Sequence, residues 1–195
     1  MRRLTRFLLL VFAFAIPWEY SLDWGPPVGN IARIAGLALL LVAIPTVLHA
    51  GRTRPPGALQ WLALALLLWA CCSCFWSVDP AETTTRVRGY AQEMLPVWLV
   101  WEFAESTEDL RWLLRAAVTG SWMLAVLTIV DMAMLESAAD QIRFSATGQD
   151  PNDVARFLDL GFPLAALLIA AERRRTWRAL AWGYLPVGLA GVLLT

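Results

Sequence analysis

Long apolar runs alternate with short polar passages along this chain, and the alternation predicts a series of membrane helices. A helix needs about 20 mostly apolar residues to cross the hydrocarbon core of a bilayer. The pattern predicts helices over residues 4–20, 31–48, 59–75, 91–103, 113–134, 154–171 and 180–194. The expected fold is therefore an all-α, polytopic transmembrane helical bundle with about six spans plus a truncated seventh. We expect one transmembrane domain over residues 1–195, ending inside an apolar run as a truncated protein would.

The first apolar run admits a second interpretation. Its start is basic and residues 7–16 are apolar, which is also the pattern of a secretory signal peptide with a cleavage-like segment at 13–15. We favour a membrane helix, because the apolar core before that segment is short for a signal peptide and Trp18 follows it as an interfacial anchor.

The fourth run, 91–103, is the least apolar of the predicted spans. Asp79 and Pro80 are predicted to open a new helical turn before it. The run contains Glu93 and Pro96, so we expect its helix to begin amphipathically near Glu82 and to enter the bilayer at an angle or with a kink. Pro163 predicts a second kink in the sixth span. The polar stretch 105–115 between the fourth and fifth runs is interpreted as a loop or surface helix.

A polar decapeptide, R-F-S-A-T-G-Q-D-P-N over residues 143–152, separates the fifth run from the sixth. Lipid does not tolerate irregular backbone, so this passage must lie at a membrane surface or line a water-filled cavity. Asp150 suits the N-cap of a helix, Pro151 suits its first position, and Asn152 adds an amide that both donates and accepts hydrogen bonds. We interpret residues 135–153 as a motif loop that leads into a helix.

Composition supports a membrane protein and removes several functional classes. Hydrophobic residues make up 58% of the chain and charged residues 16%, against about 45–50% and about 25% in soluble domains. The formal net charge is zero, which gives no reason to expect a nucleic-acid partner. His49 has no neighbouring ligands, and Cys71, Cys72 and Cys74 lie in an apolar run as small packed residues. We therefore expect no metal site and no cofactor.

The sixteen basic residues are all arginines, and their distribution predicts an orientation. Positive residues near helix ends are retained on the cytoplasmic side. With alternating spans, one side receives Arg2, Arg3, Arg6, Arg52, Arg54, Arg111, Arg115, Arg173, Arg174, Arg175 and Arg178, and the other Arg33, Arg86, Arg88, Arg143 and Arg156. We expect a cytoplasmic N-terminus and a decapeptide outside the cytoplasm.

The arginines on the minority side are the candidate ligand-binding residues, because a guanidinium binds phosphate oxygens bidentately and keeps its charge. The predicted substrate-binding residues are Arg86, Arg88, Arg143, Asn152 and Arg156, and no catalytic residue is assigned. Arg156 lies four residues after Asn152, so the two share a helical face, whereas Arg86 and Arg88 do not. Alternatively, these arginines pair with lipid phosphate or with Asp79, Glu82, Asp150 or Asp153.

Tryptophans near the predicted helix ends indicate an aromatic belt at the membrane interfaces. They are Trp18, Trp24, Trp76, Trp98, Trp101, Trp112 and Trp177. On the outer side, stacking of Trp18, Trp24 or Trp76 on a sugar ring is the alternative.

The decapeptide and the helix after it carry a family resemblance. Arg143, Asp150, Pro151, Asn152 and Ala155 stand in an order that resembles the O-antigen ligase and polymerase family of bacterial envelope glycosyltransferases. Two shorter likenesses are I-P-W-E-Y at 16–20 followed by 31–36, and W-S-V-D-P at 76–80. The similarity of layout covers nearly the whole chain.

The resemblance implies a multi-pass protein of the bacterial inner membrane that acts at the periplasmic face. Such a protein moves a glycan from undecaprenyl pyrophosphate to an acceptor, either a lipid A core sugar or a growing glycan, without a nucleotide sugar, a metal or another cofactor. Arginines, Arg143 among them, would stabilise the departing pyrophosphate, while a base would activate the acceptor hydroxyl.

The chain also departs from that family. The family has more spans and a large, later periplasmic loop with a histidine proposed as the base, whereas His49 lies on the cytoplasmic side here. Ala146 and Gln149 stand where the family commonly has glycine. We therefore interpret the chain as the N-terminal membrane part of such a ligase or polymerase, catalytically inactive by itself.

Two other functional readings remain open. A transporter or non-catalytic membrane scaffold would suit kinks at Pro96 and Pro163 together with Glu93 and Asp131 inside or near the membrane. For Asp131 we favour an interfacial carboxylate over a functional charge inside the membrane. The other reading is a partial gene product without a role of its own.

Overall fold

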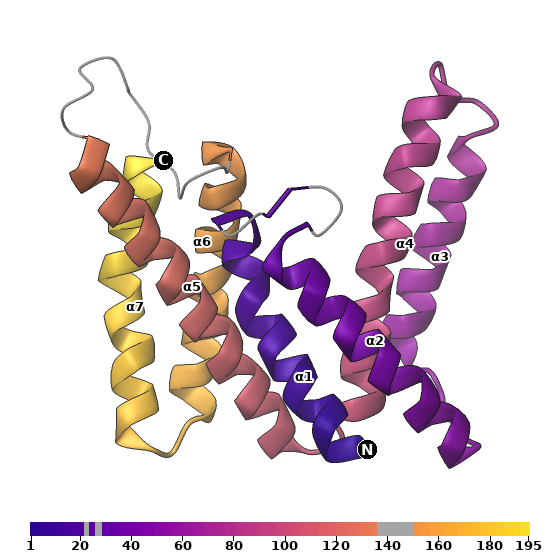
Figure 1. Cartoon of the computed structure of the whole chain (residues 1–195), viewed down its shortest axis with the longest axis horizontal. Helices are drawn as coiled ribbons and strands as arrows, with labels where there is room; N and C mark the ends of the chain where they lie inside the picture. The colour runs from indigo at the N-terminus through magenta and orange to yellow at the C-terminus, as the bar shows by residue number, and fades with distance from the viewer. Residues whose placement is uncertain (22–23, 26–28, 136–149) are drawn as a thin grey trace. The chain divides into compact units, whose positions relative to one another are not determined.

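The computed structural model describes residues 1–21, 24–25, 29–135 and 150–195, and in this part of the chain every regular element is a helix (Figure 1). The elements are α1 (Arg2–Ala15), η1 (Ile16–Ser21), α2 (Ile31–Ala50), α3 (Ala58–Ser73), α4 (Pro80–Phe103), α5 (Thr107–Leu135), α6 (Pro151–Ala171) and α7 (Arg175–Leu194). The predicted all-α class is confirmed, and each predicted apolar run lies largely within one α-helix.

Within the described residues, four helices are long and apolar enough to cross a membrane. They are α2, α5 up to Met134, α6 and α7, and α3 is a shorter apolar helix of 16 residues. These helices indicate a multi-pass membrane protein. The full count of about six spans plus a seventh stays a prediction, because α1 has only 14 residues and would be about 21 Å long at 1.5 Å per residue.

The predicted starts of α4 and α6 are confirmed, and in both an aspartate caps the helix and a proline follows it. Asp79 is the N-cap of α4 and its carboxylate accepts hydrogen bonds from the backbone of Ala81 and Glu82, at 3.0 and 3.1 Å. Asp150 is the N-cap of α6 and accepts from the backbone of Asn152 at 2.8 Å. A proline, which has no N–H to satisfy, follows each cap.

Helix α5 begins earlier than the apolar pattern predicted. The Ser106 hydroxyl accepts a hydrogen bond from the Asp109 backbone at 3.0 Å, while Asp109 Oδ2 accepts from the Ser106 backbone at 3.0 Å. This reciprocal capping starts the helix at Thr107. The stretch expected as a loop or surface helix is therefore mostly the first turns of α5.

The chain divides into two compact units. Unit 1 comprises Met1–Val42 and Ser106–Thr195, and unit 2 comprises Ala43–Glu105. The expectation of one transmembrane domain over 1–195 stays a prediction.

In unit 1, helix α5 packs against α1, α6 and α7 (Figure 1). One core cluster joins Trp18, Leu124, Ala125, Val154 and Leu158, and a second surrounds Tyr184 with Val118, Ala165, Leu168 and Ala181. The helices approach closely at Gly120, where a Cβ would overlap the carbonyl oxygen of Phe14. Gly161 makes room in the same way for the Tyr184 ring, whose hydroxyl donates to the Leu158 carbonyl at 2.7 Å.

Unit 2 contains the hairpin of α3 and α4. Arg54, before α3, contacts Trp101, in the last turn of α4. The Arg54 guanidinium lies 4.0 Å from the centre of the Trp101 ring and donates to the Trp101 carbonyl at 3.1 Å. The Arg54 backbone donates to Glu102 Oε2 at 2.8 Å, and Trp101 Nε1 donates to the Pro55 carbonyl at 3.1 Å. These contacts fix the segment before α3 against the last turn of α4.

Candidate functional site

The predicted ligand-binding residues fall in both units. Arg143 and residues 136–149 of the predicted motif loop lie outside the described residues. Within the rest of the predicted 135–153 loop, Pro151, Asn152 and Asp153 are helical, because α6 has already begun at Pro151. Asn152 is exposed in that first turn.

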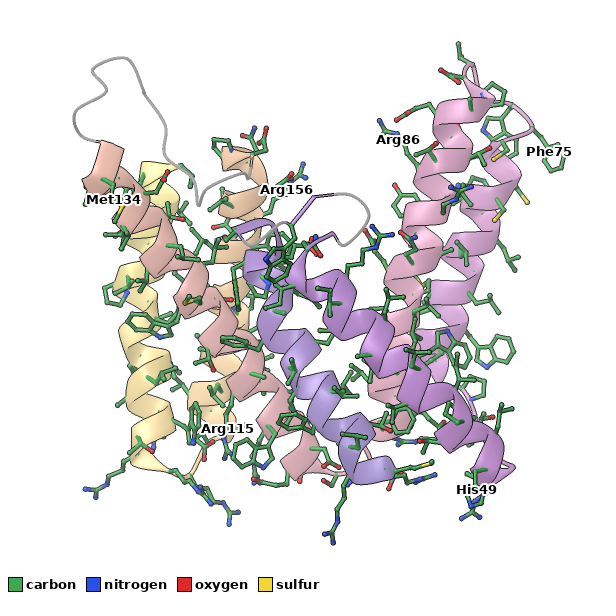
Figure 2. All side chains as sticks on the ribbon, viewed as in Figure 1. His49, Phe75, Arg86, Arg115, Met134 and Arg156 are labelled. Carbon is green, nitrogen blue, oxygen red and sulfur yellow. The ribbon has the colours of Figure 1, made fainter. Side chains whose placement is uncertain are left out.

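Arg156 stands one turn further along α6 and points away from the bundle (Figure 2). Its side chain is 78% exposed and its NH1 lies 2.9 Å from Asp153 Oδ1. For Arg156 the alternative prediction, an ion pair with a nearby carboxylate, is therefore confirmed. Exposed pairs of this kind contribute at most about 1 kcal/mol, so an incoming phosphate can compete for the guanidinium.

Arg86 and Arg88 belong to α4 in unit 2. Arg86 Nε lies 3.0 Å from Glu82 Oε1, again the carboxylate alternative, and both side chains of that pair are exposed. Arg88 is exposed and forms no ion pair with any described residue. Because α4 is one continuous helix here, the two arginines project from different faces, as residues two apart must.

The end of unit 1 where α6 begins also contains η1 and the first turn of α2. Ile31 of α2 packs against the core cluster that contains Trp18 and Val154 of α6, so the two helices begin at the same end of unit 1. Asn30 caps α2 by accepting from the Arg33 backbone at 2.8 Å, and its amide donates to Glu19 Oε2 at 3.4 Å. We call this the α2–α6 end.

Arg33 adds a second guanidinium to the α2–α6 end. It is exposed and forms no ion pair with a described residue, although Gly29, with a φ of +76°, lets the Arg33 stem lie close to the backbone. The α2–α6 end thus presents two exposed guanidiniums, on Arg33 and Arg156, and the exposed amide of Asn152. Such groups can bind a phosphate or pyrophosphate oxygen.

Trp18 does not face outward at this end. Its side chain is 5% exposed, sits in the core cluster, and donates through Nε1 to the Phe14 carbonyl at 2.8 Å. The belt and sugar-stacking interpretations are therefore wrong for Trp18. Trp24 and Trp76 are 55% and 60% exposed.

A buried ion pair at the opposite end of unit 1 was missed in the sequence. Arg115 of α5 bonds Glu172 Oε2 through Nε and NH2 at 2.7 and 2.6 Å, and the two side chains are 3% and 2% exposed (Figure 2). The guanidinium lies 4.3 Å from the Trp112 ring centre and 5.5 Å from that of Trp177. Glu172 Oε1 accepts from the Arg173 and Arg174 backbones, both at 2.9 Å.

The environment of Glu172 keeps its carboxylate ionised. Burial disfavours the charge, but the backbone N–H of Arg174, the Arg115 guanidinium and the backbone N–H of Arg173 outweigh it and hold the pKa of Glu172 below its ordinary value of 4.5. The pair joins the start of α5 to the α6–α7 turn, which is a structural role rather than a reaction site.

This lowered pKa predicts how stability depends on pH. Because the folded carboxyl has a lower pKa than the unfolded one, Glu172 contributes stability at pH above about 4.5 and loses it as the pH falls through the folded pKa. We expect thermal unfolding of the purified protein to show a smaller acid-induced decrease in Tm when Glu172 is replaced by Gln. An identical acid profile for the two proteins would contradict this assignment.

The cysteines and the histidine provide no metal centre in the described part of the chain, where no group of three His, Cys, Asp or Glu side chains is placed to hold an ion. The sequence suggested that Cys71 and Cys72 pack within the protein, but both are exposed on α3. His49 lies at the end of α2, as expected.

The fold and the candidate site together indicate a multi-pass helical membrane protein with exposed arginines at one polar end. No protein-family model, no curated protein and no solved structure matches the chain. The resemblance to O-antigen ligases and polymerases therefore stays a prediction.

Proposed function

We propose that this chain is the N-terminal membrane part of an O-antigen ligase- or polymerase-like protein of the bacterial inner membrane. In this proposal the α2–α6 end binds the pyrophosphate of an undecaprenyl-linked glycan at the periplasmic face. The acceptor is a lipid A core sugar or a growing glycan.

One observation carries the proposal: α2 and α6 begin at the same end of unit 1, so Arg33, Asn152 and Arg156 all lie at that end. Two guanidiniums and an amide suit a pyrophosphate, whose charge is spread over several oxygens. The Asp150 carboxylate already occupies the N-terminal cap of α6. Binding at this end therefore depends on the side chains rather than on free backbone N–H groups.

The distribution of arginines within unit 1 supports the periplasmic placement. The end where α5 and α7 begin also holds the N-terminus of α1 (Figure 1). That end carries Arg2, Arg3, Arg6, Arg111, Arg115, Arg173, Arg174, Arg175 and Arg178, whereas Arg33 and Arg156 lie at the α2–α6 end. Under the positive-inside rule, the arginine-rich end is cytoplasmic and the α2–α6 end is periplasmic.

The binding prediction is tested with purified protein in nanodiscs and undecaprenyl pyrophosphate. We expect Arg156→Gln to weaken binding about tenfold, since a charge-assisted hydrogen bond contributes about 1.5–3 kcal/mol. Arg33→Gln should have a similar effect. Affinity is measured by native mass spectrometry at several lipid concentrations.

Arg3→Gln is the matched control, because it removes an exposed arginine from the opposite end of unit 1. Equal affinities of all variants and the parent protein would remove the proposed site. Labelling of Asn152→Cys with an impermeant thiol reagent, after replacement of the native cysteines by alanine, tests the leaflet. Reaction from the cytosolic side alone would rule out a periplasmic role.

A transporter-like scaffold remains the second candidate, and Glu93 is the residue that favours it. Glu93 is exposed in mid-α4 and forms no ion pair with any described residue, while Pro96 follows within the same helix. A carboxylate at such a position suits an ion or solute path. Proton-coupled uptake into proteoliposomes that is abolished by Glu93→Gln would favour this candidate over pyrophosphate binding.

A further inference from the structure

A cluster of exposed arginines surrounds the turn between α6 and α7. Its members are Arg173, Arg174, Arg175 and Arg178, and we call them the α7 arginine cluster. They occupy the short segment after α6 ends at Ala171 and the first turn of α7. The cluster lies at the end of unit 1 opposite the α2–α6 end (Figure 1).

The guanidiniums of this cluster form no ion pair with any described residue, and the structure shows why. Glu172 is the only acidic residue between Asp159 and the end of the chain, and its two oxygens are already bound. Oε2 accepts from Arg115, and Oε1 accepts from the backbones of Arg173 and Arg174. The carboxylate is buried against Arg115, so it leaves the side chains of the cluster uncompensated.

Three other arginines at the same end of unit 1 are paired. Arg6 lies 3.4 Å from Asp109, Arg111 lies 3.0 Å from Glu108, and Arg115 is bound to Glu172. The carboxylates of this end are thus engaged by arginines outside the cluster. Positive charge therefore remains concentrated at the α6–α7 turn.

The location of the turn indicates which anion it meets. Helices α6 and α7 are both long and apolar enough to cross a membrane, so the turn that joins them lies at a membrane surface. Trp177 stands within the cluster's sequence and packs edge-on against Trp112, with ring centres 6.4 Å apart. Tryptophan at a helix end is typical of the headgroup region.

We propose that the α7 arginine cluster binds the phosphodiester head groups of anionic phospholipids in the adjoining leaflet. Four exposed guanidiniums without carboxylate partners, set beside tryptophans at the head-group level, are complementary to a negatively charged lipid surface. The proposal concerns the end of unit 1 opposite the α2–α6 end and does not depend on the glycan-transfer hypothesis.

Lipid enrichment measured by energy transfer tests this assignment. The full chain, with Cys71, Cys72 and Cys74 replaced by alanine and the exposed Thr176→Cys carrying a donor dye, is reconstituted in phosphatidylcholine vesicles. Acceptor dye is placed on the acyl chain of either phosphatidylglycerol or phosphatidylcholine at equal mole fraction. We expect at least about a threefold enrichment of phosphatidylglycerol near the dye, decreasing at high salt.

The quadruple variant R173Q/R174Q/R175Q/R178Q should abolish the enrichment. Its substitutions keep the backbone N–H groups that bind Glu172, so the turn should stay folded. The half-variants R173Q/R174Q and R175Q/R178Q should each lose part of it, which keeps the test valid if the quadruple variant unfolds. Arg111→Gln is the matched control, because Arg111 is already paired with Glu108.

Three outcomes would overturn the proposal. One is equal energy transfer to the two lipids. Another is an enrichment that the half-variants leave unchanged, which would place the lipid elsewhere. Complete competition by millimolar inorganic phosphate at constant ionic strength would also overturn it, since the cluster would then be a site for a soluble anion.

Discussion

Replacement of Glu172 by alanine should destabilise the protein by about 3–5 kcal/mol, the usual cost of leaving one charge of a buried pair without its partner. The Arg115 side chain is 3% exposed and would keep only a 3.5 Å contact with Glu108, whose side chain is half exposed. The backbones of Arg173 and Arg174 would also lose their acceptor. Unfolding in mixed micelles, followed by tryptophan fluorescence, measures the change.

A double replacement separates the contribution of the ion pair to stability from the contribution of the volume that its side chains fill. Arg115→Met with Glu172→Met removes both charges and keeps apolar volume, so it should cost less than Glu172→Ala alone. The matched exposed pair is Arg86–Glu82, where Glu82→Ala should cost less than about 1 kcal/mol. If Glu172→Ala and Glu82→Ala have the same small effect, Arg115 and Glu172 are not a buried structural pair.

Gly120→Ala should destabilise unit 1 by about 1–3 kcal/mol, the range for overpacking a close contact. The new Cβ would overlap the backbone carbonyl of Phe14, which also accepts the hydrogen bond of Trp18 Nε1. Backbone cannot rotate away as a flexible side chain can, so α1 and α5 must separate. We expect a lower Tm and greater exposure of Trp18 to an aqueous fluorescence quencher.

Gly89→Ala provides the matched control for this substitution. Gly89 also lies within a helix, α4, but a Cβ there meets nothing within 4 Å. Alanine should therefore leave stability unchanged or raise it by up to about 1 kcal/mol through helix propensity. Equal Tm changes at the two positions would show that helix propensity, not the contact with Phe14, determines the effect.

The apolar pattern predicted the helical class because each long run has to satisfy its backbone internally. The local signals Asp79-Pro80 and Asp150-Pro151 predicted two helix starts correctly, since capping depends on residues next to each other in the sequence. The capping by Ser106 and Asp109 is equally local. It was missed because the charged residues after it were interpreted as a loop or surface helix and not as the first turns of α5.

Features that depend on distant residues were not predictable in the same way. Arg115 and Glu172 are 57 residues apart, and each by itself reads as an ordinary charge at a membrane surface. Trp18 follows an apolar run, a pattern that does not distinguish an interfacial anchor from a core residue packed against Leu124 and Leu158. For the candidate site, Asn152 and Arg156 could be placed on one helix from spacing. The position of Arg33 at the same end of unit 1 could not be predicted from spacing, because it follows from the packing of Ile31 on the cluster that contains Val154.

The long sequence separation of Arg115 and Glu172 also imposes an order on assembly at the ribosome. Helix α5 emerges first, with its guanidinium facing water, and the carboxylate follows 57 residues later. Burial of Arg115 therefore has to wait until α6 has been inserted and the chain has turned back toward α7. The contact between the start of α5 and the α6–α7 turn can therefore form only after α6 has been synthesised.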